Sequence, residues 1–259
     1  MKIAIIGAGN MGGAIARGLA LSNMDIDIAL ADLDQNKLDE IKAEYSAIEI
    51  STNSSEVVCN ADVVLLAVKP WLVEPVIKGV LPTLDLSKQI ILSIAAGVEI
   101  SVLTQWLGDA NAVVFRAIPN TAISILQSMT FISHNSNASK QQIDDVKTIF
   151  NALGKAAIIE ERLMGAATSL CSCGIAFAMR YVRAATEGGV ELGIYPDEAK
   201  QYVLQTLRGA VELLEATGNN PEVEIDKVTT PGGITIKGLN AMEAHGFTNA
   251  VIEGLKASK

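Results

Sequence analysis

The stretch KIAIIGAGNMG, residues 2–12, decides how the first half of the chain folds. Its apolar, β-branched start predicts a buried strand over 2–6, and residues 10–21 carry apolar side chains at helical spacing. A G-x-G-x-x-G turn between a strand and a helix is typical of dinucleotide binding, because the helix start offers free N–H groups to phosphates. An ordinary glycine-rich turn is the alternative. We predict cofactor contacts from Gly7, Gly9, Asn10, Met11 and Gly12.

The second predicted strand, over 26–31, is followed by Asp32. At this spacing an acidic residue meets the ribose hydroxyls of a dinucleotide. Asp34 comes next, and the first Lys or Arg after the strand is Lys37. Since a 2′-phosphate would meet two carboxylates and no close cation, we predict an NAD(P)H site in which NADH is preferred over NADPH. The alternative is that Asp32 only caps the helix that begins near Asn36.

Strands and helices alternate through residues 1–155. Apolar runs at 63–68, 89–94 and 113–116 predict buried strands, 130–133 predicts another strand, and Ser139 is the expected N-cap of a helix to 153. The fold class is therefore α/β, with a Rossmann-type doubly wound, mostly parallel sheet over 1–155.

The pattern changes to helices alone over residues 156–259. One long helix is predicted from about 160 to 193, and prolines at 196, 221 and 231 precede three more helices. Apolar helices of this kind fold best by packing against a second copy. We therefore predict an all-α dimerisation domain over 156–259.

Composition bounds the class of protein. The chain has 259 residues, of which 49% are hydrophobic, and a formal net charge of −9. These values exclude a disordered chain and argue against nucleic acid as a partner. The mean hydropathy of +0.33 predicts that a second subunit covers part of the surface. We interpret the apolar stretch 163–179 as a buried or interface helix rather than a membrane span, because it contains Thr168, Ser169 and Ser172.

Cysteine and histidine placement disfavours a disulfide framework and a metal site. Cys59, Cys171 and Cys173 are too few and too oddly spaced for a disulfide framework. Cys171 and Cys173 could form half a zinc site, but His134 and His245 are far away in sequence, so we predict no metal. No secretory signal is visible, and we expect a cytoplasmic homodimer with reduced thiols. The sequence leaves open whether dimers join into a larger ring.

Four further segments complete a family pattern: AVKP (67–70), SIAAG (93–97), RAIPNT (116–121) and VTTPGGIT (228–235). In this order, after the glycine turn, they make the chain resemble the pyrroline-5-carboxylate reductase family over nearly its whole length. The resemblance implies an N-terminal Rossmann domain, a C-terminal helical dimerisation domain and a cyclic imine substrate. The implied activity is reduction of 1-pyrroline-5-carboxylate to L-proline by NAD(P)H.

The resemblance also implies roles for individual residues. Further cofactor contacts are expected from Ala67, Val68, Lys69, Pro70, Ala95, Ala96, Gly97 and Asn120, and from Ser54, where the family usually has Asn. The substrate carboxylate would be held by the loop with Thr230, Gly232, Gly233 and Ile234, while Thr235 would be catalytic by hydrogen-bonding the ring nitrogen. Glycines before a helix leave N–H groups free for an anion. An ordinary helix start with a Thr cap is the alternative.

One segment departs from the family pattern. The chain reads CSCGIAF at 171–177 where members typically read SGSGPAY. Cys171 and Cys173, expected to approach the substrate, carry thiols that bond more weakly than hydroxyls. Loss of the proline predicts a helix that starts earlier or runs straighter. Three interpretations of this departure stay open. The family contact is made by the backbone and tolerates the changed side chains, the substrate is another cyclic imino acid, or the protein is a non-catalytic NAD(H)-binding homologue.

Imine reduction mainly requires positioning, because the protonated imine is already electrophilic. The main enzymatic rival, a 3-hydroxyacid dehydrogenase, needs a general acid or base. Residues 156–199, where its helix-borne lysine would fall, contain no Lys and no His. Lys69 follows one predicted strand and Arg116 ends another, both at the edge of the sheet where α/β proteins bind ligands. The alternatives are a solvated Lys69 and an ion pair between Arg116 and a domain-interface carboxylate.

Overall fold

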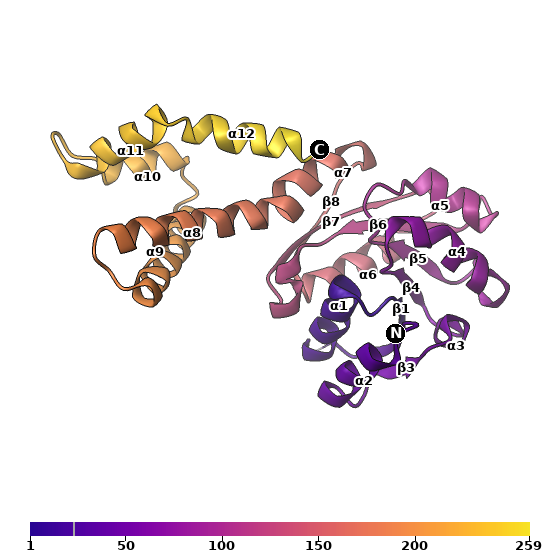
Figure 1. Ribbon diagram of the computed structural model, residues 1–259. Helices are drawn as coiled ribbons and strands as arrows, with labels where there is room; N and C mark the ends of the chain where they lie inside the picture. The colour runs from indigo at the N-terminus through magenta and orange to yellow at the C-terminus, as the bar shows by residue number, and fades with distance from the viewer. Residues whose placement is uncertain (23) are drawn as a thin grey trace. The chain divides into compact units, whose positions relative to one another are not determined.

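A computed structural model describes residues 1–22 and 24–259, which form two compact units, Met1–Ser172 and Cys173–Lys259 (Figure 1). The first unit contains an eight-stranded sheet with the order β3-β2-β1-β4-β5-β6-β7-β8. Only the β6–β7 pair is antiparallel among the described neighbours. The strands are β1 (Lys2–Ile6), β2 (Asp27–Ala31), β3 (Glu49–Ser51), β4 (Val63–Leu66), β5 (Ile90–Ser93), β6 (Val113–Ile118), β7 (Ser128–His134) and β8 (Gly154–Ile158). The order of β1 to β6 confirms the predicted Rossmann fold.

Helices cover both faces of this sheet, as strand β1 shows. Its Ile3 and Ile5 belong to a core shared with α1 (Asn10–Leu21), α2 (Gln35–Glu44) and α6 (Lys140–Asn151). The intervening Ala4 and Ile6 belong to the core shared with α3 (Ser54–Val58), α4 (Pro70–Val80) and α5 (Ile100–Leu107). Alternate side chains of a strand point to opposite faces, so the near-continuous apolar run is a strand buried on both sides.

The first unit extends beyond the predicted domain boundary at 155/156. That boundary falls inside β8, which pairs with β7 from Ser128–Gly154 to Ile132–Ile158. The chain then continues through 3₁₀ helix η3 (Glu161–Leu163), α7 (Met164–Ala167) and a π-helical segment, Thr168–Cys173. Residues 156–172 therefore belong with the sheet rather than with the C-terminal helices.

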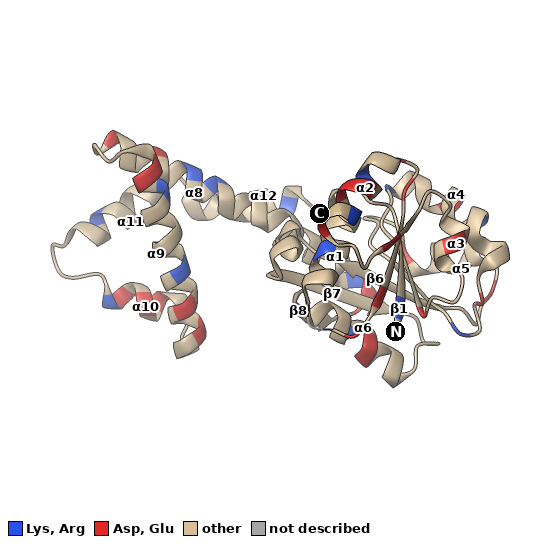
Figure 2. Cartoon of the chain, turned by 90° about the horizontal axis from the view of Figure 1, so that it is seen from below, with Lys and Arg blue, Asp and Glu red and all other residues tan. Residues whose placement is uncertain are grey.

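The second unit is entirely helical, as predicted. It consists of α8 (Gly174–Glu191), α9 (Pro196–Thr217), α10 (Pro221–Lys227), α11 (Ile234–Ala244) and α12 (Phe247–Ala257). Helices α8 and α9 pack against each other, and acidic residues gather on α10 (Figure 2). Among the described residues of this unit, Ala199 alone is buried. A set of helices without a core of its own needs another surface to cover its apolar residues.

The predicted long helix is continuous from Glu161 to Glu191, although its first turns are 3₁₀ and π in type. The π turn ends just before Ile175, which stands in α8 where the family pattern has proline. Thr168 and Ser169 donate hydroxyl hydrogen bonds to the carbonyls of Met164 and Gly165 there. By length and composition alone this helix could cross a membrane, and it is the one such helix in the described part of the chain.

Candidate functional site

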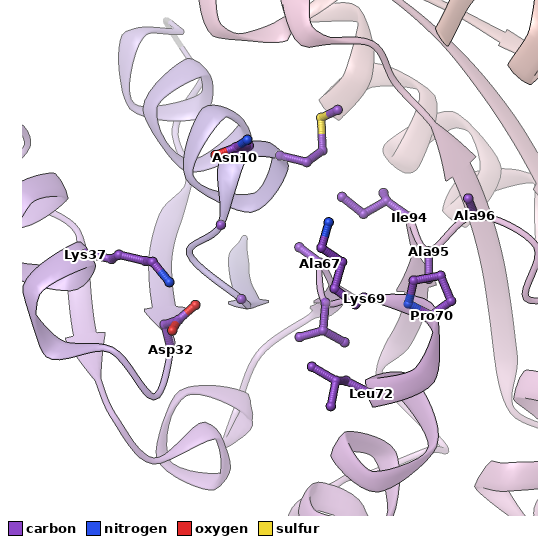
Figure 3. Close-up of a pocket in the computed structure, with 14 residues that line it drawn as sticks. Asn10, Asp32, Lys37, Ala67, Lys69, Pro70, Leu72, Ile94, Ala95 and Ala96 are labelled. Atoms are coloured by element: carbon purple, nitrogen blue, oxygen red, sulfur yellow. The ribbon is translucent and has the colours of Figure 1, made fainter. Parts of the chain in front are cut away.

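A cavity of about 610 Å³ lies beside the carboxyl ends of the central strands (Figure 3). The loops after β1, β2, β4 and β5 line it, and the strand order reverses between β1 and β4. Open α/β sheets bind ligands at such a switch point. The structure brings together there the predicted cofactor residues Gly7, Gly9, Asn10, Met11, Asp32, Ala67, Val68, Lys69, Pro70, Ala95 and Ala96.

The glycine loop is shaped for close approach of a phosphate. Gly7 has φ of +108°, and a Cβ there would lie 2.6 Å from the carbonyl oxygen of Ala67. A Cβ on Gly12, which does not line the cavity, would overlap the carbonyl oxygen of Gly7. A Cβ on Gly9 would meet nothing within 4 Å. Because Gly9 is the N-cap of α1 and has no side chain, the first N–H groups of the helix are accessible to an anion.

Asp32 fastens this loop to the end of β2. One carboxylate oxygen accepts the N–H of Ala8 at 2.6 Å and the other accepts the N–H of Asp34 at 3.0 Å. The N-cap of α2 is Asp34, whose side chain accepts the N–H of Asn36. The alternative interpretation of Asp32 as the helix cap is therefore wrong.

Three lining residues, Lys37, Leu72 and Ile94, were missed by sequence reasoning. The Lys37 Nζ atom lies 3.3 Å from Asp34 Oδ2, and Figure 3 shows Lys37 pointing toward Asp32. The premise that this end of the cavity has no close cation is therefore wrong. The i, i+3 spacing of Asp34 and Lys37 on one helix was the available signal. Leu72 follows the segment 67–70, Ile94 lies within the segment 93–97, and both add apolar surface.

Besides Gly12, three more of the predicted cofactor residues do not line this cavity. Ser54 is the first residue of α3, whose N-cap is Asn53. Gly97 lines a neighbouring cavity of about 460 Å³. Asn120 is buried, accepts the N–H of Ala122 and donates from Nδ2 to the Cys171 carbonyl at 3.4 Å. For these residues, cofactor contact stays a prediction.

The predicted substrate loop lies in the second unit. The N–H of Gly233 donates to the Thr230 carbonyl at 2.9 Å, and Gly232 has φ of +73°. With Pro231 before Gly232, this is the pattern of a type II turn. A Cβ on Gly233 would lie 2.6 Å from Thr230 Oγ1, and Ile234 and Thr235 are exposed at the start of α11. The turn leaves the first N–H groups of α11 accessible, while its contact with a substrate stays a prediction.

Cys171 and Cys173 lie half-buried at the π-helical segment. Burial raises the pKa of the Cys171 thiol, because a thiolate would lose its hydration there. No group of three potential metal ligands occurs among the described residues. Contact of either thiol with a substrate stays a prediction.

The histidines and Arg116 have structural contacts. His134 ends β7 with its Nδ1 atom 2.8 Å from the Asn135 carbonyl, and His245 is the C-cap of α11. Neither lines the larger cavity. Arg116 forms an ion pair, with Nη1 2.6 Å from Glu161 Oε1, but this carboxylate lies within the first unit rather than at a domain interface.

Known proteins resemble this chain over both units. The family model described as pyrroline-5-carboxylate reductase dimerisation matches residues 161–259, and that described as NADP oxidoreductase, coenzyme F420-dependent, matches 2–97. Pyrroline-5-carboxylate reductase 2 of Dictyostelium discoideum is 35% identical over 99% of this chain and 90% of its own length. Pyrroline-5-carboxylate reductase 1 of that organism is 36% identical over 99% of the chain, which spans 48% of that relative. A crystal structure of Plasmodium falciparum pyrroline carboxylate reductase with NADP bound has a TM-score of 0.90 and 26% identity, over 100% of this chain and 95% of its own.

Proposed function

This chain belongs to the pyrroline-5-carboxylate reductase family, and from that premise we propose that it reduces 1-pyrroline-5-carboxylate to L-proline. The cavity at the switch point of the sheet is the observation that carries the proposal, because its glycine loop fits a dinucleotide phosphate. NAD(P)H bound there would supply a hydride to the imine carbon, while the imine nitrogen, protonated from water, becomes the secondary amine.

Each part of the protein has a positioning role in this proposal. The start of α1 holds the pyrophosphate and Asp32 the adenosine ribose. Lys69, Pro70, Ala95 and Ala96 border the nicotinamide, and the turn before α11 holds the substrate carboxylate. Thr235 hydrogen-bonds the ring nitrogen, since its hydroxyl can donate or accept. Positioning of this kind is sufficient because a protonated imine needs no further activation.

NADH is the preferred coenzyme in our proposal, by a smaller margin than the sequence alone implies. The Asp32 carboxylate lines the adenosine end and the Asp34 carboxylate lies beside the lining residue Lys37, which together disfavour a 2′-phosphate. Lys37 offers one ammonium group there, but its charge is shared with Asp34 at 3.3 Å.

The oligomeric state we propose is a homodimer held together by the C-terminal helices. Whether dimers assemble further into a ring is a question for a measurement of molecular mass in solution. The exposed apolar residues of α8 and α9 would face the second subunit rather than lipid. A cytoplasmic location fits the three free cysteines. The acidic net charge of −9 fits a small-molecule enzyme without a nucleic-acid partner.

The test is an assay with the purified protein and 1-pyrroline-5-carboxylate, following loss of the absorbance of NADH and then of NADPH. We expect turnover with both and a higher kcat/KM with NADH. A higher kcat/KM with NADPH would keep the reaction and overturn the coenzyme preference. NADH binding without turnover would overturn the proposed reaction. A panel of other cyclic imines then separates an altered substrate from a non-catalytic homologue.

A further inference from the structure

One carboxylate oxygen joins three segments that are far apart in the sequence. Glu161 Oε1 lies 2.6 Å from Arg116 Nη1 and accepts the backbone N–H of Ile100 at 2.8 Å. Arg116 is on β6, Ile100 is the first residue of α5, and Glu161 begins the long helix. The Arg116 side chain is only 7% exposed, so its positive charge has to be compensated by the carboxylate of Glu161.

The bond to Ile100 serves as a helix cap supplied from a distance. The N-cap residue of α5 is Glu99, whose side chain makes no capping hydrogen bond. The first N–H groups of a helix lack partners within the helix, and a carboxylate near them is favoured by the helix dipole. Glu161 fills this role from 61 positions along the chain.

This cap holds one end of the turn that borders the cofactor cavity. The turn joins β5 to α5, and Ala95 and Ala96 line the cavity from it (Figure 3). Its β5 end is held by Ser93 Oγ, which accepts the N–H of Ala95 at 3.2 Å. Gly97, next along the turn, lines the neighbouring cavity together with Arg116 and Glu161.

We propose that Arg116 and Glu161 are positioning residues that hold the turn Ala95–Gly97 in place for hydride transfer. The proposal rests on the function proposed above. A buried ion pair is weak support for stability, because desolvation offsets much of the attraction, but it fixes geometry well. Small displacements of reacting groups are costly, since a misplacement of about 1 Å can slow a reaction by about a hundredfold.

The test compares Glu161→Ala, Glu161→Gln and a matched control, Glu160→Ala. The control removes the neighbouring exposed ion pair, in which Glu160 and Arg162 lie 2.6 Å apart. We expect Glu161→Ala to lower kcat by about tenfold or more and to enlarge the isotope effect with NADH deuterated at nicotinamide C4. The amide oxygen of Gln can still accept from Ile100 and Arg116, so Glu161→Gln should recover most of kcat. Glu160→Ala should match the wild type.

A double variant, Arg116→Met with Glu161→Leu, separates positioning from folding. Replacing a buried ion pair by apolar residues often preserves stability, but this change also removes the acceptor for the Ile100 N–H. We expect it to fold and to stay slow, with the enlarged isotope effect. Wild-type kcat and isotope effect in the folded double variant would overturn the proposal, even if Glu161→Ala fails to fold.

The dissociation constant for NADH is measured on every variant without substrate. We expect it to rise in Glu161→Ala and in the folded double variant and to stay unchanged in Glu160→Ala. If the wild type binds NADH but reduces no imine, the proposed function fails while this comparison still tests the positioning role. In that case, an unchanged NADH dissociation constant in Glu161→Ala would overturn the positioning role of Glu161. If Glu161→Ala does not fold, the double variant gives the same test.

Discussion

Gly9 and Gly12 lie on the same loop, but the space around them differs. An alanine at Gly9, whose φ of −68° suits any residue, would place its methyl in open space where a phosphate approaches. An alanine at Gly12 would overlap the Gly7 carbonyl. We expect Gly9→Ala to fold normally and to bind NADH about tenfold more weakly, a loss of about 1.4 kcal/mol. Gly12→Ala should lower the free energy of unfolding by about 1–3 kcal/mol or more.

Urea denaturation and an NADH titration check this pair of glycine variants. The same two measurements on the wild type give the reference. The assignment of the loop as a phosphate site would be contradicted if Gly9→Ala bound NADH with wild-type affinity.

Under the proposed function, Lys37 should determine how well NADPH is tolerated, because it lines the cavity beside Asp32 and Asp34. Removing it should leave two carboxylates facing a 2′-phosphate. We expect Lys37→Ala to lower kcat/KM for NADPH by about tenfold, as loss of a charge-assisted hydrogen bond of about 1.5–3 kcal/mol implies, and to leave NADH nearly unchanged. Steady-state kinetics with each coenzyme measure this, with Lys147→Ala, at an exposed position of α6, as the control. An equal fall for both coenzymes would show that Lys37 does not read the 2′-position.

At the scale of elements, the π-helical segment holds the thiol of Cys171 in a half-buried position. Burial raises the pKa of Cys171, so less of it is thiolate at neutral pH. We expect iodoacetamide to label Cys171 more slowly than exposed Cys59 at neutral pH, with the rate for Cys171 levelling off at a higher pH than that of an ordinary thiol. Mass spectrometry of labelled peptides over a pH series measures both rates, and Cys171→Ser confirms the peptide assignment. Equal rates at neutral pH would contradict the effect of burial.

Elements with strong local signals could be predicted from the sequence, and elements held by tertiary contacts could not. The apolar run of β4 and the N-cap Ser139 are local signals, and both predictions are confirmed. The three-residue β3 depends on pairing with β2. The glycine loop was predictable because its spacing is a fixed geometric requirement. Glu161 was missed because Arg116 comes close to it only in the fold, whereas the spacing of Asp34 and Lys37 was a local signal that went unused.

At the scale of the whole chain, the two units differ in what stabilises each of them. The first has buried residues on both faces of its sheet. The second has one buried residue, Ala199, among those described, and exposed Phe177, Leu204 and Leu213. The family model for dimerisation covers this second unit. Folding of the C-terminal helices should therefore depend on association of two chains, whereas the first unit has its own core.

This difference predicts two thermal transitions, one that depends on protein concentration and one that depends on NADH. The transition of the C-terminal helices should rise in temperature with protein concentration, because only the associated state is stable, whereas NADH should raise that of the sheet unit. Leu213→Asp should dissociate the dimer by placing a charge on the exposed apolar surface of α9, while Glu212→Lys, at the adjacent exposed position, should leave it intact. Calorimetry at several concentrations and light scattering measure these effects. One transition, independent of concentration in the wild type and unchanged in Leu213→Asp, would mean that the C-terminal helices are stable without a partner.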